Sequence, residues 1–135
     1  MPSDQHKLRI AAAYGFLAVA FGAMGAHFLK KHWEETLPFD EVSKFVEIWK
    51  TASFYHIVHS VVLLVLAFAY PGRKEGRVPF LLIECGTVLF SGSLYALCLF
   101  KAAWLGPVTP VGGALLMAGW ASLGICPLIC GRNKA

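Results

Sequence analysis

The sequence predicts an all-α polytopic membrane protein, an up-down bundle of four transmembrane helices. Hydrophobic residues make up 57% of the 135 residues and charged residues only 15%, which is more apolar surface than a soluble domain of this size can bury. Asp, Glu, Lys and Arg are absent from three long segments, residues 10–26, 51–70 and 102–131. We therefore expect a single membrane domain covering residues 1–135.

Four apolar segments are long enough to cross a bilayer, since a hydrocarbon core about 30 Å thick requires roughly 20 helical residues. The predicted spans cover about residues 8–29, 50–70, 78–100 and 108–129. Only the third contains an acidic residue, Glu84. Two of the connections are short, which makes the helices that they join antiparallel neighbours.

The longer connection, between the first and second spans, is predicted to contain an amphipathic helix over about residues 38–49. Pro38 suits a first helical turn, and two acidic residues follow it, as is favourable at a helix N-terminus. Apolar residues then recur at the i, i+3, i+4, i+7 spacing of one helical face: Val42, Phe45, Val46 and Trp49. We expect this helix to lie at the membrane interface before the second span.

The basic residues flank the spans and bear on topology. The side that holds both termini and the 71–77 loop carries seven Lys and Arg residues, against five on the other side. By the positive-inside rule this favours both termini on the cytoplasmic or matrix side. Because the basic residues are not interleaved with aromatic residues in one patch, we expect no nucleic-acid partner.

Polar side chains inside the spans form the candidate site. A charged side chain there costs about 2.5 to 3.5 kcal/mol on insertion scales, so each ionisable residue requires an explanation. Helical depths at 1.5 Å per residue predict that one set converges in the half of the bundle beneath the amphipathic helix: His27, His56, His59, Ser91, Ser93, Tyr95 and Thr109.

Glu84 is predicted to lie in the other half of the bundle, at about the depth of Tyr14 on the first span. A carboxyl group in apolar surroundings needs a partner or access to water. We therefore expect either a hydrogen bond from Tyr14 to Glu84 or exposure of Glu84 to a lumen.

Several chemistries fit the histidine cluster. Neutral imidazoles can simply hold helices together through hydrogen bonds of about 1 kcal/mol each; they can also bind the head of a lipid or quinone-like molecule, or move protons or solutes. Ligation of haem b is the weakest alternative, because His27 lies about 6 Å shallower than His56. The four cysteines lie inside the spans without a Cys-x-x-Cys pair, so no metal site or other cofactor is predicted.

Small residues recur at four-residue intervals in the spans, as in Ala114, Ala118 and Ser122. In lipid, such positions allow close backbone approach between helices. We expect them to pack mainly within the bundle. A homo-oligomer or a complex with another membrane protein is the alternative, and the bilayer itself is the expected partner.

Four blocks of the sequence resemble the transmembrane protein 256 family, also known as domain of unknown function 423. They are Gly22 to His27, Thr51-Ala52 followed by Tyr55 to Ser60, Phe90 to Tyr95, and Thr109 to Gly113 with Gly119-Trp120. The resemblance implies a small four-span protein of bacterial inner membranes or mitochondria, and no particular activity. The motif positions of that family include His27, His56, Ser91, Tyr95 and Thr109.

No phosphate loop, nucleophile elbow or zincin helix occurs in the sequence, so we expect no enzymatic activity. The leading hypothesis is a membrane protein that binds a lipid or quinone-like ligand or stabilises a membrane complex. The alternative is a small transporter or proton pathway that uses intramembrane His and Glu residues. We expect it in a bacterial cytoplasmic membrane or a mitochondrial inner membrane.

Overall fold

The computed structural model consists of helices and short connections. It describes residues 2–70 and 73–132, and within them the side chains of 5–70, 73–102 and 104–125. In the described residues, four helices are long and apolar enough to cross a membrane: Gln5–Thr36, Phe39–Ala69, Arg77–Phe100 and Val108–Ile125. The same residues contain no strand. The predicted all-α fold with four spans is confirmed.

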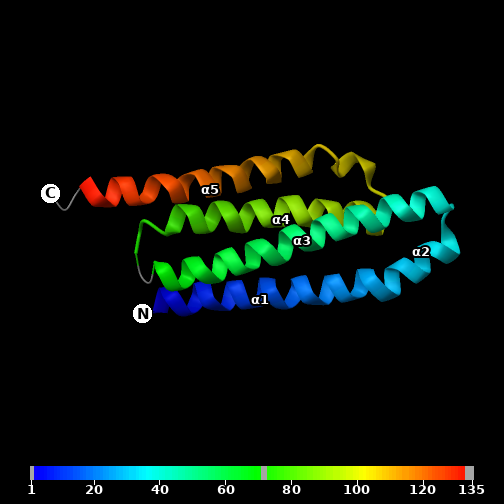
Figure 1. Ribbon diagram of the computed structural model, residues 1–135, viewed down its shortest axis with the longest axis horizontal. Helices are drawn as coiled ribbons and strands as arrows, with labels where there is room; N and C mark the ends of the chain where they lie inside the picture. The colour runs from blue at the N-terminus through cyan, green and yellow to red at the C-terminus, as the bar shows by residue number, and fades with distance from the viewer. Residues whose placement is uncertain (1, 71–72, 133–135) are drawn as a thin grey trace.

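The long helices form an open row (Figure 1). Helix α1 (Pro2–Met24) packs on α3 (Phe39–Ala69), α3 packs on α4 (Arg77–Phe100), and α4 packs on α5 (Val108–Arg132). In the most apolar 18-residue stretch of each span, 39% of the residues are buried in α3 and in α4. In the first and last spans the same fraction is only 17%. The central helices α3 and α4 therefore hold the core, and the outer two present most of their surface to lipid.

The first span continues beyond residue 29, where its end was expected. Helix α1 passes through a π-helical turn, η1 (Gly25–Leu29), into α2 (Lys30–Thr36). Leu37 is then extended, with φ −124° and ψ 155°, which is the conformation that a following proline favours. Pro38 therefore determines where this helix ends, rather than the end of the apolar run.

Residues 39–49 are helical, one residue short of the predicted start at Pro38, but they do not form a separate interfacial helix. They begin α3, which contains 31 residues and is therefore about 46 Å long at 1.5 Å per residue. No Gly or Pro interrupts it between Phe39 and Ala69. Because α3 is longer than a hydrocarbon core of about 30 Å, its first turns extend beyond that core. Their apolar face packs on η1 and α2 instead of on lipid headgroups.

Two apolar clusters make up the core. The first, which we call the aromatic cluster, lies toward the α2–α3 connection and contains Leu29, Trp33, Val42, Trp49, Ala52, Tyr95 and Cys98. The second, the aliphatic cluster, lies toward the α3–α4 connection and contains Ala11, Leu63, Leu66, Ala67, Phe80, Ile83 and Leu116. Buried polar side chains occupy the levels between the clusters, namely His56, His59, Ser60, Thr87, Ser91 and Ser93. The polar residues thus form a central layer, and the region beneath the amphipathic segment is aromatic.

Helices α4 and α5 approach each other closely at a glycine. Gly112 lies so near the main chain of Phe90 that a β-carbon would overlap it. Close approach of this kind supplies the dispersion contacts that hold helices together in lipid. Ala114 and Ala118, from the predicted small-residue stripe, are exposed instead. The packing face of α5 is therefore its glycine face.

Replacing Gly112 with Ala is expected to destabilise the protein by about 1 to 3 kcal/mol, because the new β-carbon would meet the main chain of Phe90 and force α4 and α5 apart. Gly113→Ala is the matched control, since its β-carbon would lie 3.7 Å from the Phe90 ring, an ordinary contact. Thermal unfolding in mild detergent measures both. Equal melting temperatures for the two variants would show that the glycine contact does not hold these helices together.

Candidate functional site

The seven side chains predicted to converge are distributed over four places in the structure. His56, Ser91 and Tyr95 line one cavity, His59 contacts α5, Ser93 pairs with Thr109, and His27 lies on the outer surface. Helical depth alone had placed these residues in one group. The direction in which each side chain points then separates them.

His56 is held at the centre of the bundle by groups from its own helix and from two others. It is 7% exposed, and its Nδ1 lies 3.4 Å from the hydroxyl of Tyr95 on α4. That hydroxyl donates to Ser53 Oγ, 3.3 Å away, which leaves it able to accept from His56 when Nδ1 carries the proton. The rings of Tyr14 and Phe21, both on α1, have centroids 5.8 and 6.2 Å from the imidazole. In this tautomer Nε2 carries no proton and can accept a hydrogen bond.

A cavity of about 220 Å³ lies between α1, α3 and α4; we call it the lateral cavity. It is lined by Tyr14, Leu17, Phe21, His56, Thr87, Val88, Ser91, Gly92 and Tyr95. Leu17, Val88 and Gly92 are exposed at the surface of the bundle. The lateral cavity therefore opens sideways, toward the lipid, and not toward either aqueous phase.

Ser91 has the polar atom of the lateral cavity that lacks a hydrogen bond. The residue is 2% exposed, and its Oγ is the one buried side-chain N or O atom without a partner among the described residues. Thr87, one turn earlier, is also buried but donates to the carbonyl of Ile83 at 2.7 Å. Leaving a buried hydroxyl unpaired costs about 1 to 3 kcal/mol. Ser91 is therefore the residue of the lateral cavity lining with a buried hydroxyl whose hydrogen bond no described residue supplies.

His59 is fully paired and joins α3 to α5. Its Nδ1 lies 2.7 Å from the carbonyl of Tyr55, which can only accept. Its Nε2 accepts the indole N–H of Trp120 at 3.2 Å. Both nitrogens are thus satisfied in the neutral tautomer with the proton on Nδ1. Among the roles considered from the sequence, the geometry of His59 fits the structural one.

Ser93 and Thr109 form a second polar link, between α4 and the first turn of α5. Their hydroxyl oxygens are 2.7 Å apart, and Ser93 also donates to the carbonyl of Phe90 at 3.0 Å. This pair lies at the α4–α5 contact, outside the lateral cavity. The two residues therefore stabilise the last hairpin.

His27 lies in the π-helical turn η1, with its side chain exposed. It does not approach His56 or His59, and these two point toward different neighbouring helices. In the described part of the chain, no three His, Cys, Asp or Glu side chains are grouped as metal ligands would be. The exposed His27 side chain therefore does not join the buried His56 and His59, contrary to the expectation from depth.

Tyr14 and Glu84 are neighbours, as their depths predicted, but the hydrogen bond between them does not involve the Glu84 side chain. The Tyr14 hydroxyl donates to the main-chain carbonyl of Glu84 at 3.5 Å, and not to its carboxylate. The half-buried Glu84 side chain instead lines a groove between α1 and α4. Tyr14 thus stands between Glu84 and His56 without connecting their side chains by hydrogen bonds.

Two aromatic residues of the site were not singled out from the sequence. Phe21 packs its ring 4.8 Å from Tyr95 and lines the lateral cavity. Trp49 was assigned only to an interfacial face, yet its indole donates to the carbonyl of Phe21 at 2.8 Å. Gly25, one turn after Phe21, lies directly against the Trp49 ring. In the sequence, Phe21 precedes Gly25 by four positions, which is about one helical turn. This spacing is only a weak indication that the two residues receive an aromatic side chain from another helix.

Comparison with known proteins identifies relatives along most of the chain. A family model described as a protein of unknown function, DUF423, matches residues 21–113. The chain is 40% identical to the UPF0382 inner membrane protein YgdD of Escherichia coli, over 88% of this chain and 86% of that protein. It is 36% identical to the UPF0382 membrane protein YwdK of Bacillus subtilis, over 82% and 86%. A UPF0382 membrane protein of Schizosaccharomyces pombe is 33% identical, over 84% and 94%. No solved structure shows a significant match.

Replacing Trp120 with Phe is expected to reduce stability by about 0.6 kcal/mol and at most about 1.7 kcal/mol, because it removes the donor to His59 Nε2 while keeping an aromatic ring. Trp104→Phe serves as the control, since Trp104 is an exposed residue of the 3-10 turn η2 (Ala103–Leu105). Unfolding in detergent is the measurement. If both variants unfold alike, His59 is not holding α5 through Trp120.

Proposed function

Because the chain belongs to the DUF423 family of small membrane proteins, we propose a function that rests on the lateral cavity of the chain itself. We infer that the protein is a non-enzymatic binding protein of the membrane. Its ligand is a lipid-soluble molecule with a hydroxyl-bearing head, as in the reduced form of a quinone-like lipid. The observation that carries this proposal is the buried, unpartnered hydroxyl of Ser91 in a cavity that opens toward lipid.

The polar groups of the lateral cavity match a hydroxyl head. Ser91 Oγ–H can donate to the ligand oxygen, and His56 Nε2 can accept the ligand proton. The aromatic rings of Tyr14, Phe21 and Tyr95 provide flat apolar walls for a ring-shaped head. One hydroxyl would thus satisfy the Ser91 side chain, whose hydrogen bond no described residue provides.

The size of the lateral cavity indicates how much of a ligand it holds. At about 220 Å³ it is smaller than the roughly 300 to 1,000 Å³ of sites that enclose a drug-sized molecule. It can therefore take a head group, while the apolar tail passes between Leu17 and Val88 into the bilayer. A lateral opening also allows entry from the membrane without transfer through water.

We propose further that both termini lie on the cytoplasmic or matrix side. The chain is an integral membrane protein, and the Escherichia coli relative is named an inner membrane protein. The N-terminal start of α1 and the C-terminal end of α5 lie on the same side of the row as the α3–α4 connection (Figure 1). Of the Lys and Arg residues that the structure describes, six belong to that side and five to the other, which supports this orientation.

Ser91→Ala is expected to weaken binding of a decyl-substituted benzoquinol by about three- to ten-fold, because one hydrogen bond to the ligand is lost. Without ligand the same variant should be as stable as the wild type, or up to about 1 kcal/mol more stable, because a buried unpaired hydroxyl is removed. Quenching of tryptophan fluorescence measures binding, and thermal unfolding measures stability.

Two further variants sharpen this test. Ser122→Ala is the control, since Ser122 lies on α5 and donates to its own helix at 2.6 Å. Gly92→Leu adds bulk at the mouth of the lateral cavity, where a β-carbon meets no atom within 4 Å, so it should block the benzoquinol in a folded protein. If Ser91→Ala binds as Ser122→Ala does, or if folded Gly92→Leu binds normally, the lateral cavity is not the site.

A further inference from the structure

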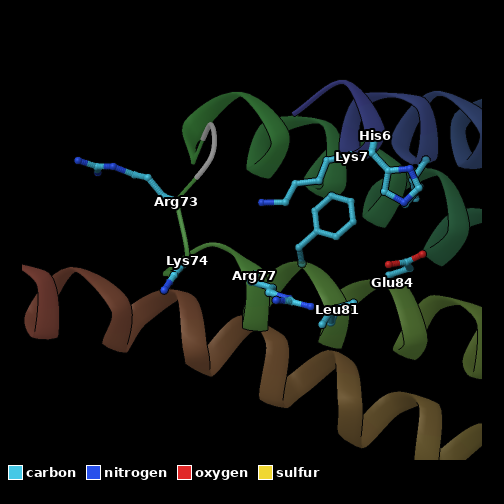
Figure 2. Close-up of a pocket in the computed structure, with 9 residues that line it drawn as sticks. His6, Lys7, Arg73, Lys74, Arg77, Leu81 and Glu84 are labelled. Atoms are coloured by element: carbon cyan, nitrogen blue, oxygen red, sulfur yellow. The ribbon is translucent and has the colours of Figure 1, made fainter. Parts of the chain in front are cut away.

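A basic groove lies at the end of the bundle that holds the α3–α4 connection (Figure 2). Its volume is about 550 Å³, more than twice that of the lateral cavity. It lies between the first turns of α1 and α4, and the connection contributes to its wall. It does not include His56 or Ser91, so nothing proposed above accounts for it.

The groove concentrates positive charge from three separate segments. Lys7 comes from α1, Arg73 and Lys74 from the connection, and Arg77 from the first turn of α4. Against these four cations stands one carboxylate, Glu84. The ion pairs that join described side chains, Lys30–Glu34 and Lys50–Glu47, lie at the other end of the bundle. The ion pairs between these described side chains therefore involve no cation of the groove.

Apolar side chains form the rest of the groove. Ile10, Phe80 and Leu81 line it, and the ammonium of Lys7 lies 5.7 Å from the centre of the Phe80 ring. Leu81 is exposed, so the apolar part is continuous with the lipid-facing surface of α4. Cations beside an apolar surface at the end of a membrane span match the arrangement of a phospholipid, whose phosphate lies above its acyl chains.

The position of Glu84 limits where an anion can lie. Glu84 is seven residues after Arg77 on α4, about 10 Å deeper along the helix. Figure 2 shows its carboxylate at the opposite side of the groove from Arg73 and Lys74. A phosphate between Lys7 and the basic residues of the mouth would therefore be close to cations and far from the Glu84 carboxylate.

We propose that the basic groove binds an anionic phospholipid, with its phosphate between Lys7 and Arg77 and an acyl chain along Ile10 and Leu81. Arg77 can hold phosphate oxygens through two parallel N–H groups. A free phosphate would leave the apolar part of the groove uncovered, and a choline lipid would bring its own cation toward four others. Both are therefore poorer matches than a phospholipid with net negative charge.

The test is native mass spectrometry of the full chain in mild detergent, titrated separately with phosphatidylglycerol, phosphatidylcholine and inorganic phosphate. Phosphatidylglycerol is expected to bind at least ten-fold more tightly than phosphatidylcholine. In Lys7→Gln/Arg77→Gln this preference should fall by at least ten-fold. Lys31→Gln/Lys44→Gln removes the same charge from exposed residues outside the groove and should bind phosphatidylglycerol as the wild type does.

A further variant, Lys7→Arg/Arg77→Lys, preserves charge and should retain binding of phosphatidylglycerol within about three-fold, which separates loss of charge from loss of fold. Equal binding by the groove variant and the control pair would overturn the site. Displacement of phosphatidylglycerol by millimolar inorganic phosphate would overturn the lipid as its occupant. Equal affinity for the two lipids would overturn the requirement for net negative charge.

Discussion

The hydrogen bond from the Trp49 indole to the main-chain carbonyl of Phe21 connects the first two spans, and much of the structure depends on it. Gly25 allows the ring to approach the backbone of the first span at the start of the π-helical turn. Trp49 then packs its ring 4.6 Å from Tyr95 and 6.0 Å from Trp33. One side chain thereby joins three helical segments and places Phe21 and Tyr95 as walls of the lateral cavity.

In the polar layer between the two apolar clusters, almost every described buried side chain has a hydrogen-bond partner, as the absence of water inside a membrane requires. His59 satisfies both ring nitrogens through Tyr55 and Trp120, and the other buried hydroxyls of the layer bond to main-chain or side-chain oxygens. Buried polar groups in apolar surroundings are expensive unless paired. Ser91 departs from this pattern among the described residues. Its departure coincides with the lateral cavity, so a polar atom without a partner and a space for a ligand occur at the same place.

The two ends of the bundle differ in chemistry, because different constraints act on them. At the α2–α3 end, α3 is longer than the hydrocarbon core is thick, and Pro38 marks the turn that precedes it. Aromatic packing stabilises the hairpin that α2 and α3 form there. At the other end, cations from separate segments gather around the basic groove. Tyr14 reaches from α1 to the backbone of Glu84 between these regions. The lateral cavity and the basic groove share no lining residue, so the two proposed sites are separate.

The sequence by itself determined the four spans, their antiparallel order and the depth of each polar residue, because apolar length and helical rise are local properties. It also placed Tyr14 at the level of Glu84. Only the tertiary structure decided which side chains meet. His56 and His59 are three residues apart, yet one contacts α1 and α4 and the other contacts α5. The direction of a side chain around its helix follows from how neighbouring helices pack, at Gly25 and Gly112 for example, and depth along one axis contains no information about that rotation.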